Sequence, residues 1–304
     1  MQNSKTPEAT PAYSYPQFTE EMRKTYKILV PNMLPVQLGL ICRLMKNYGY
    51  DMELLHTEGP NIAEQGLRNV HNDTCYPALL VIGQFLDALN SGKYDLEHTA
   101  LLITQTGGGC RASNYIKLLR KALVKAGYGN IPVASLNFSG LEKGSGLPLT
   151  VPLLRKVIAS IFYGDMLVAL RSQTYPYEDR RGDADAMTEK WISTIQGWIR
   201  GDKNYSAHDM KKRFYDIAAD YATIPITRVP KVKVGVVGEI YVKYSPLGNN
   251  DLEKFLESQD CEVNLPGLMG FVEYCVANYK LDIDLYGGNK LVAGGADAFL
   301  SWLD

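Results

Sequence analysis

The sequence predicts an α/β protein built on a doubly wound, Rossmann-like parallel sheet, and three observations support this fold class. Segments typical of strands alternate with segments typical of helices along residues 26–150. An apolar run from Leu101 ends in three glycines and is followed by a helical pattern, as in a buried strand, a tight turn and a helix. The 304 residues, 46% of them hydrophobic, are enough for two domains.

The first unit is expected over residues 26–150, after a flexible polar arm of residues 1–25. Its strands are predicted at 26–31, 51–55, 101–106 and 131–137. Its helices are predicted from Pro35 to the residue before Gly49, at 61–70, at 78–89 and from the glycine turn to Lys125. Because every strand is followed by a helical segment, the strands should pair in parallel.

A helical region and linker are expected over residues 151–230. Helices are predicted at 151–171, 184–199 and 207–222, and Pro225 and Pro230 mark the linker. A second, smaller α/β unit follows over residues 231–304, with a strand at 232–238, a helix from Leu252 and a strand at 262–265. Two strands are fewer than a self-standing sheet usually has. We therefore expect apolar surface to be exposed near Trp302 and Leu303, which either meets a partner or marks a truncated unit.

Composition narrows the class of protein. The net charge of -1 gives no reason to expect nucleic acid or an anionic membrane as a partner. Residues 1–25 do not resemble a signal peptide, and the longest apolar segment, 151–170, is interrupted by Arg155, Lys156 and Asp165. These features predict a soluble, cytoplasmic protein.

Two cysteines are predicted at one edge of the first sheet. Cys75 precedes the helix at 78–89, and Cys110 follows the glycine turn of the strand that begins at Leu101. Parallel sheets bind ligands beyond the carboxyl ends of their strands. Free N–H groups and the positive end of the helix dipole stabilise an anion there, whether a thiolate or a phosphate.

The other three cysteines have ordinary structural interpretations. Cys42 lies on the apolar stripe of the first helix, Cys261 begins a strand, and Cys275 lies in an ordinary helical pattern. An odd number of widely spaced cysteines argues against a disulfide framework.

The glycine turn leaves a second interpretation open. Gly107-x-Gly109-x-x-Ala112 fits a dinucleotide fingerprint, but no acid follows about 20 residues later, where the ribose would need one. Neither a P-loop nor a nucleophile elbow is present. The alternative to a metal site is thus a metal-free module that binds phosphate or a nucleotide with the Gly107–Gly109 turn.

Several motifs resemble those of one known family. They are Asn72-Asp73-Thr74-Cys75-Tyr76-Pro77, Ile82-Gly83-Gln84, and Gly108-Gly109-Cys110-Arg111 with Tyr115. They resemble the iron–sulfur proteins related to 2-hydroxyacyl-CoA dehydratases, and more closely the large acyl-CoA dehydratase activase-related proteins. Gly238-Glu239-Ile240-Tyr241, with Asn249 and Leu252, is similar to the opening of the family's second α/β domain. The resemblance covers roughly residues 26–290.

The resemblance implies a cofactor, partners and ligands. In that family, cysteines from different lobes hold a [4Fe–4S] or related cluster, and an ATP-hydrolysing activator delivers low-potential electrons. Cys75 and Cys110 would be ligands in a dehydratase- or reductase-like component that acts on a small-molecule or acyl-CoA-type substrate. The chain departs from the family in lacking a proline before Cys110. The family's further cysteine would lie beyond Asp304, and Cys275 is the candidate to replace it.

The remaining candidate residues surround the two thiols. Backbone N–H groups of Gly108 and Gly109 could bond to the sulfides of a cluster. The side chains of Asn72, Arg111 and Ser113 could add hydrogen bonds. Two thiolates are half of the usual four ligands, which indicates a truncated chain or a cluster shared across a homodimer. The sequence identifies neither a substrate nor a general acid–base pair.

Overall fold

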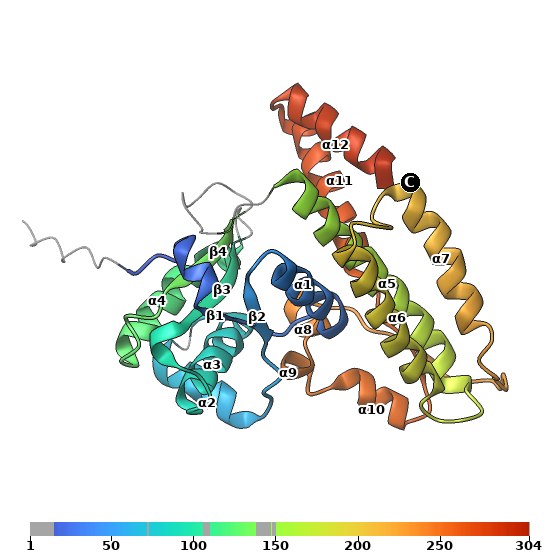
Figure 1. Cartoon of the computed structure of the whole chain (residues 1–304), viewed down its shortest axis with the longest axis horizontal. Helices are drawn as coiled ribbons and strands as arrows, with labels where there is room; N and C mark the ends of the chain where they lie inside the picture. Colours follow the sequence, from blue (N-terminus) through green and yellow to red (C-terminus); the bar gives the residue numbers. More distant parts are fainter. Residues whose placement is uncertain (1–14, 72, 106–109, 138–146, 148–149, 304) are drawn as a thin grey trace, which may run out of the picture. The chain divides into compact units, whose positions relative to one another are not determined.

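The computed structural model describes residues 15–71, 73–105, 110–137, 147 and 150–303 (Figure 1). The chain divides into two compact units. The first comprises Met1–Pro31 and Gly49–Pro148, and the second comprises Asn32–Tyr48 and Leu149–Asp304.

The first unit is built on a parallel sheet with the strand order β2-β1-β3-β4. Its strands are β1 (Lys27–Val30), β2 (Asp51–Leu54), β3 (Thr99–Gln105) and β4 (Val133–Asn137). All three pairings are parallel, so the predicted α/β class with a parallel sheet is confirmed. The strand order reverses between β1 and β3, and in such sheets the crevice beyond the carboxyl ends of these two strands is the usual ligand position.

The helices of the first unit are α2 (Pro60–Asn69), α3 (Tyr76–Asn90) and α4 (Tyr115–Lys125). Short 3-10 helices cover Glu21–Lys24, Leu96–His98 and Arg111–Asn114. Helix α3 is buried along nearly its whole length, including the side chains of Ile82, Phe85 and Leu86. A helix that is apolar on all sides is typical of a protein core.

Helices α2 and α3 lie side by side and approach closely through two glycines (Figure 1). A Cβ atom added to Gly83 would lie 2.0 Å from the carbonyl oxygen of Ile62. One added to Gly66 would lie 2.3 Å from the carbonyl oxygen of Leu79. The two backbones therefore meet where neither helix has a side chain, and a larger residue cannot be accommodated without separating them.

The second unit is mainly helical. Its helices are α1 (Pro35–Asn47), α5 (Val151–Thr174), α6 (Asp183–Arg200), α7 (Ala207–Tyr221), α8 (Ile240–Tyr244), α9 (Pro246–Asn249), α10 (Leu252–Ser258), α11 (Leu268–Tyr286) and α12 (Lys290–Leu303). A short 3-10 helix covers Tyr175–Tyr177, and β5 (Lys233–Gly235) pairs in parallel with β6 (Glu262–Asn264). The helices expected between residues 151 and 222 are present with nearly the predicted ends. Helix α1 follows β1 in sequence but packs against α5 and α6.

The charges that interrupt the apolar pattern of α5 join it to other elements. Asp165 accepts hydrogen bonds from the Gln37 side chain on α1 and from the Met269 backbone N–H at the start of α11, each at 2.8 Å. Lys156 is buried, pairs with Asp202, and lies 5.3 Å from the ring centroid of Tyr48. These charges are therefore structural links within a helical unit.

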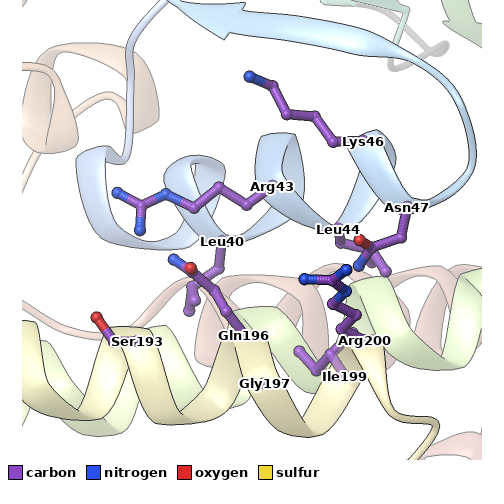
Figure 2. Close-up of a pocket in the computed structure, with 10 residues that line it drawn as sticks. All are labelled: Leu40, Arg43, Leu44, Lys46, Asn47, Ser193, Gln196, Gly197, Ile199 and Arg200. Atoms are coloured by element: carbon purple, nitrogen blue, oxygen red, sulfur yellow. The ribbon is translucent and has the colours of Figure 1, made fainter.

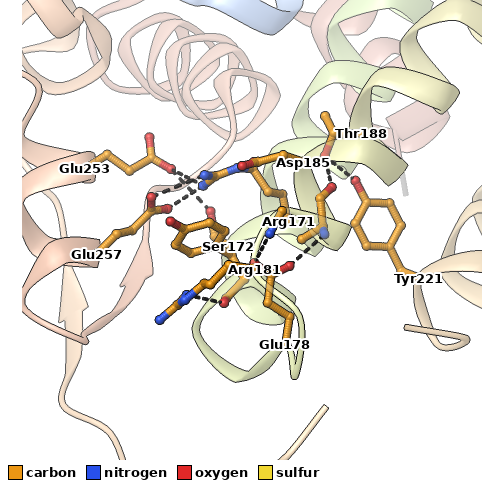
Figure 3. Close-up of polar contacts among 12 residues, drawn as sticks. Arg171, Ser172, Glu178, Arg181, Asp185, Thr188, Tyr221, Glu253 and Glu257 are labelled. Carbon is orange, nitrogen blue, oxygen red and sulfur yellow. Dashed lines mark hydrogen bonds and ion pairs between the residues drawn. The ribbon is translucent and has the colours of Figure 1, made fainter. Parts of the chain in front are cut away.

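Arg171, near the end of α5, links three helices (Figure 3). Its guanidinium group donates to Asp185 on α6 at 2.6 Å and binds Glu257 on α10. It also lies 3.9 Å from Glu253 on α10. Burial raises the pKa of Glu253, and the positive charge of Arg171 opposes that rise. One partly buried arginine thus neutralises carboxylates from two separate helices.

The far end of the second unit exposes apolar side chains. Tyr274, Leu285 and Tyr286 on α11 and Leu291 on α12 are all more than half exposed. The side chains of Trp302 and Leu303, which the sequence singled out, lie outside the described residues. Within the part of the chain that the structure describes, no helix combines the length and apolar character needed to cross a membrane.

We expect Gly83→Ala to destabilise the first unit by about 1–3 kcal/mol, because the new methyl group must push α2 away from α3. Urea unfolding followed by circular dichroism measures this change. Gly39→Ala on α1 is the matched control, since nothing lies within 4 Å of its added Cβ. The control should be neutral or stabilise its helix by about 1 kcal/mol. Equal effects of the two substitutions would contradict the close contact between α2 and α3.

A second prediction concerns pH and Glu53 on β2. Partial burial by itself would raise the pKa of Glu53, but hydrogen bonds from Lys93, Tyr94 and Lys27 outweigh burial and lower it to about 2. A lowered folded-state pKa gives stability that is present above the unfolded pKa of roughly 4.3 and is lost as the pH falls toward 2. Glu53→Gln should therefore destabilise the protein at neutral pH and flatten the acid dependence in this window.

Urea unfolding at a series of pH values tests the Glu53 prediction. Glu58→Gln is the control, because Glu58 is exposed and has no ion pair among the described residues. An unchanged acid dependence in Glu53→Gln would show that other carboxylates control the transition.

Candidate functional site

Cys110 lies beyond the carboxyl end of β3, at the start of a short helix. It is the N-cap residue of the 3-10 helix Arg111–Asn114, which continues directly into α4. The Ala112 backbone N–H donates to the Cys110 sulfur at 3.5 Å, and the cysteine is exposed. The thiol therefore occupies the position where free N–H groups favour a negative charge.

Cys75 occupies the equivalent position on α3. It is the N-cap residue, with an extended backbone (φ -61°, ψ 148°), and Pro77 lies in the first turn as predicted. Its sulfur makes no capping hydrogen bond to the helix, and Cys75 is partly buried. The sulfur is therefore available for contacts with other elements.

The Cys75 sulfur contacts the start of α4. It lies 2.9 Å from the hydroxyl oxygen of Tyr115, the first residue of that helix. Tyr115 is separated from Cys110 only by the short 3-10 helix Arg111–Asn114. The contact therefore joins the start of α3, which carries Cys75, to the start of α4, which follows Cys110. When Cys75 is a thiolate, the tyrosine hydroxyl must be the hydrogen-bond donor.

The buried side-chain amide of Gln105 anchors the 3-10 helix that follows Cys110. Gln105, the last residue of β3, accepts a hydrogen bond from the Ser135 hydroxyl at 2.9 Å and donates to the Ser113 carbonyl at 3.4 Å. Gln105 is almost fully buried, so both ends of its amide need partners. It fixes the 3-10 helix that carries Cys110 to the ends of β3 and β4.

Tyr115 and Gln105 were not among the candidate residues derived from the sequence. Tyr115 belonged to a motif behind the family resemblance, but its contact with Cys75 depends on how two helices pack. Gln105 could have been recognised as a polar residue at the end of an apolar strand, where parallel sheets place functional or anchoring groups.

Of the other site residues predicted from the sequence, the structure describes only some. Asn72, Gly107, Gly108 and Gly109 lie outside the described residues, as does the Arg111 side chain. Ser113 is partly buried, and its carbonyl is used by Gln105. Cys275 lies on α11 in the second unit and is exposed.

The remaining cysteines and His71 play local roles. Cys42 is buried in α1, and burial raises the pKa of its thiol to about 12. The Cys261 sulfur lies 3.7 Å from the Gln259 carbonyl. The His71 ring accepts from the Asp73 backbone N–H at 3.2 Å, as a turn-forming residue would.

The donor set of this edge fits part of a metal centre. Two thiols stand at helix starts, and thiolates are the usual protein ligands of iron–sulfur clusters. Within the described ranges, no three histidine, cysteine, aspartate or glutamate side chains come together as a metal site would require. The edge thus offers two thiols, and a cluster bound there would need further ligands from elsewhere.

Comparisons with protein-family models, with curated proteins and with solved structures gave no match. The family resemblance therefore rests on the sequence motifs described above.

Thiol reactivity tests the geometry of the cysteines without any assumption about a metal. Burial raises the pKa of the Cys42 thiol to about 12 and shields its sulfur from reagents, whereas Cys110 is exposed. Iodoacetamide should therefore label Cys110 much faster than Cys42 in the folded protein. Peptide mass spectrometry at timed intervals measures the rates. Similar rates for Cys42 and Cys110 would show that α1 opens readily or is packed differently.

Proposed function

We propose that this protein is an iron–sulfur component similar to the dehydratase and activase-related proteins. Cys75 and Cys110 would hold a [4Fe–4S] or related cluster that accepts low-potential electrons for a difficult reduction. The observation that carries the proposal is the 2.9 Å contact between the Cys75 sulfur and the Tyr115 hydroxyl. This contact brings the two cysteine-bearing helix starts to one edge of a parallel sheet.

The electrostatics of this edge support thiolate ligands. Neither α3 nor the 3-10 helix Arg111–Asn114 has an acidic residue in its first turn. No carboxylate in these first turns therefore opposes the helix dipoles. Helix α4 adds Lys117 in its first turn, whose positive charge favours a cluster of net negative charge.

Hydrogen bonds to the sulfurs would set the reduction potential. The Tyr115 hydroxyl is in place to donate to Cys75, and the Ala112 N–H donates to Cys110. Such bonds stabilise the more negative, reduced state of a cluster and raise its potential. The exposure of Cys110 offers an external electron donor, such as an ATP-hydrolysing activator, a short approach to a ligand.

The ligand count defines the rest of the proposal. Iron–sulfur clusters of this kind usually have four thiolate ligands, and this edge has two. The others would come from Cys275, from a second copy of the chain or from a non-protein ligand. When bound, the cluster would supply single electrons to an acyl-CoA-type or other small-molecule substrate.

Anaerobic reconstitution with iron and sulfide tests the proposal. The wild-type chain should become brown, with broad visible absorption and bound iron, whereas Cys75→Ser and Cys110→Ser should lose most of both. Cys42→Ser and Cys261→Ser are the matched controls and should keep the colour. Tyr115→Phe should keep the iron and lower the reduction potential, because it removes a hydrogen bond to a ligand sulfur.

Two further results decide between the alternatives. Loss of iron in Cys275→Ser would identify this residue as a third ligand. A colourless wild-type protein, in which phosphate or a nucleotide protects the Gly107–Gly109 turn from hydrogen exchange, would overturn the cluster and favour the metal-free binding module.

A further inference from the structure

A cavity in the second unit lies between α1 and α6 and has a volume of about 380 Å³ (Figure 2). Its lining comes from residues 40–47 and 193–200. Binding sites for small molecules have volumes of about 300–1,000 Å³, so this cavity is large enough for a small metabolite. None of the cysteines lines it, so a ligand of this cavity would be independent of the proposed cluster.

The charged side chains that line the cavity are all basic. Arg43, Lys46 and Arg200 line it, and no carboxylate does. Arg43 extends along α1 beside the cavity, Arg200 rises from α6 toward α1, and Lys46 points away from α6 (Figure 2). Among the described residues, the guanidinium groups of Arg43 and Arg200 form neither a hydrogen bond nor an ion pair. The two arginines that line this cavity therefore have no protein partner among the described residues.

A third donor in the cavity is buried and has no partner among the described residues. The side-chain nitrogen of Gln196 is shielded from solvent and makes no hydrogen bond. Figure 2 shows this amide rising from α6 toward α1. A buried donor without an acceptor is unfavourable, and an acceptor atom brought within its reach would satisfy it.

Helix dipoles explain only part of this arrangement. Lys46 and Arg200 lie in the last turns of α1 and α6, where a cation is favourable without any ligand. The unpaired amide of Gln196 has no such explanation, because it is uncharged. Arg43 lies one turn before the end of α1, where the dipole effect is weaker.

The other side of the cavity is apolar. Leu40, Leu44 and Ile199 line it and are buried in the helix packing. A ligand that uses the whole cavity would thus combine an apolar body with an anionic head. Guanidinium groups match the oxygens of phosphate in pairs, and a phosphate monoester offers three such oxygens.

We propose that this cavity binds a phosphate monoester with an apolar body. Arg43 and Arg200 hold the phosphate oxygens, Gln196 donates to the same group, and the apolar body lies against Leu40, Leu44 and Ile199. The phosphate dianion neutralises two cations that have no counter-charge in the described chain.

Isothermal titration calorimetry of the full chain with phenyl phosphate, inorganic phosphate and phenol tests this assignment. Phenyl phosphate should bind more tightly than inorganic phosphate, and phenol should not bind measurably. The double variant Arg43→Gln/Arg200→Gln should weaken phenyl phosphate binding at least tenfold. Gln196→Leu should weaken it severalfold, because it removes the donor and keeps the side-chain size.

Lys211→Gln is the matched control, because Lys211 is exposed on α7 and its loss changes the net charge in the same direction. This variant should bind phenyl phosphate as the wild type does.

All replaced side chains except Gln196 are exposed, and thermal melting verifies that each variant is folded. Absence of phenyl phosphate binding by the wild type, or unchanged affinity in the double arginine variant, would overturn the proposal. Binding of phenol as tight as that of phenyl phosphate would also overturn it.

Discussion

The burial of helix α3 is the constraint on which the candidate site depends. Because this helix is surrounded by the core, its axis cannot shift without breaking contacts on all sides. The backbone contact of Gly83 with Ile62 fixes how closely α2 can approach it. The start of α3, and with it Cys75, is therefore held at a defined position beside the first turn of α4.

The two units use polar groups differently. In the second unit, Arg171 and Asp165 lie within helix packing and are satisfied by partners from other helices. Such groups are costly to bury alone, so each fixes the helices that supply its partners. Arg43, Arg200 and Gln196 lack partners of this kind among the described residues, and this contrast distinguishes a candidate binding cavity from ordinary structural ion pairing.

At the edge of the first sheet, structural and functional requirements coincide. Gln105 is buried and anchors the 3-10 helix that follows Cys110, while Tyr115 contacts the sulfur of Cys75. Gln105 acts on Cys110 indirectly, by fixing the backbone that follows it, whereas Tyr115 contacts the Cys75 sulfur directly. The cluster proposed for this edge would need such a fixed geometry, because hydrogen bonds to its ligand sulfurs would help to set its potential.

Local structure could be predicted from the sequence alone. The apolar run that begins at Leu101 and the proline before Ala78 were enough to locate β3 and the start of α3, since periodicity and backbone restrictions act over a few residues. The sequence also placed Cys75 and Cys110 at helix starts. Tertiary packing, in contrast, determined that α1 packs with α5 and α6, that Tyr115 reaches Cys75, and that Gln196 has no partner among the described residues. An apolar stripe shows that a helix must bury one face. Which element covers that face depends on how all the helices and strands fit together, and this is not encoded in any local pattern.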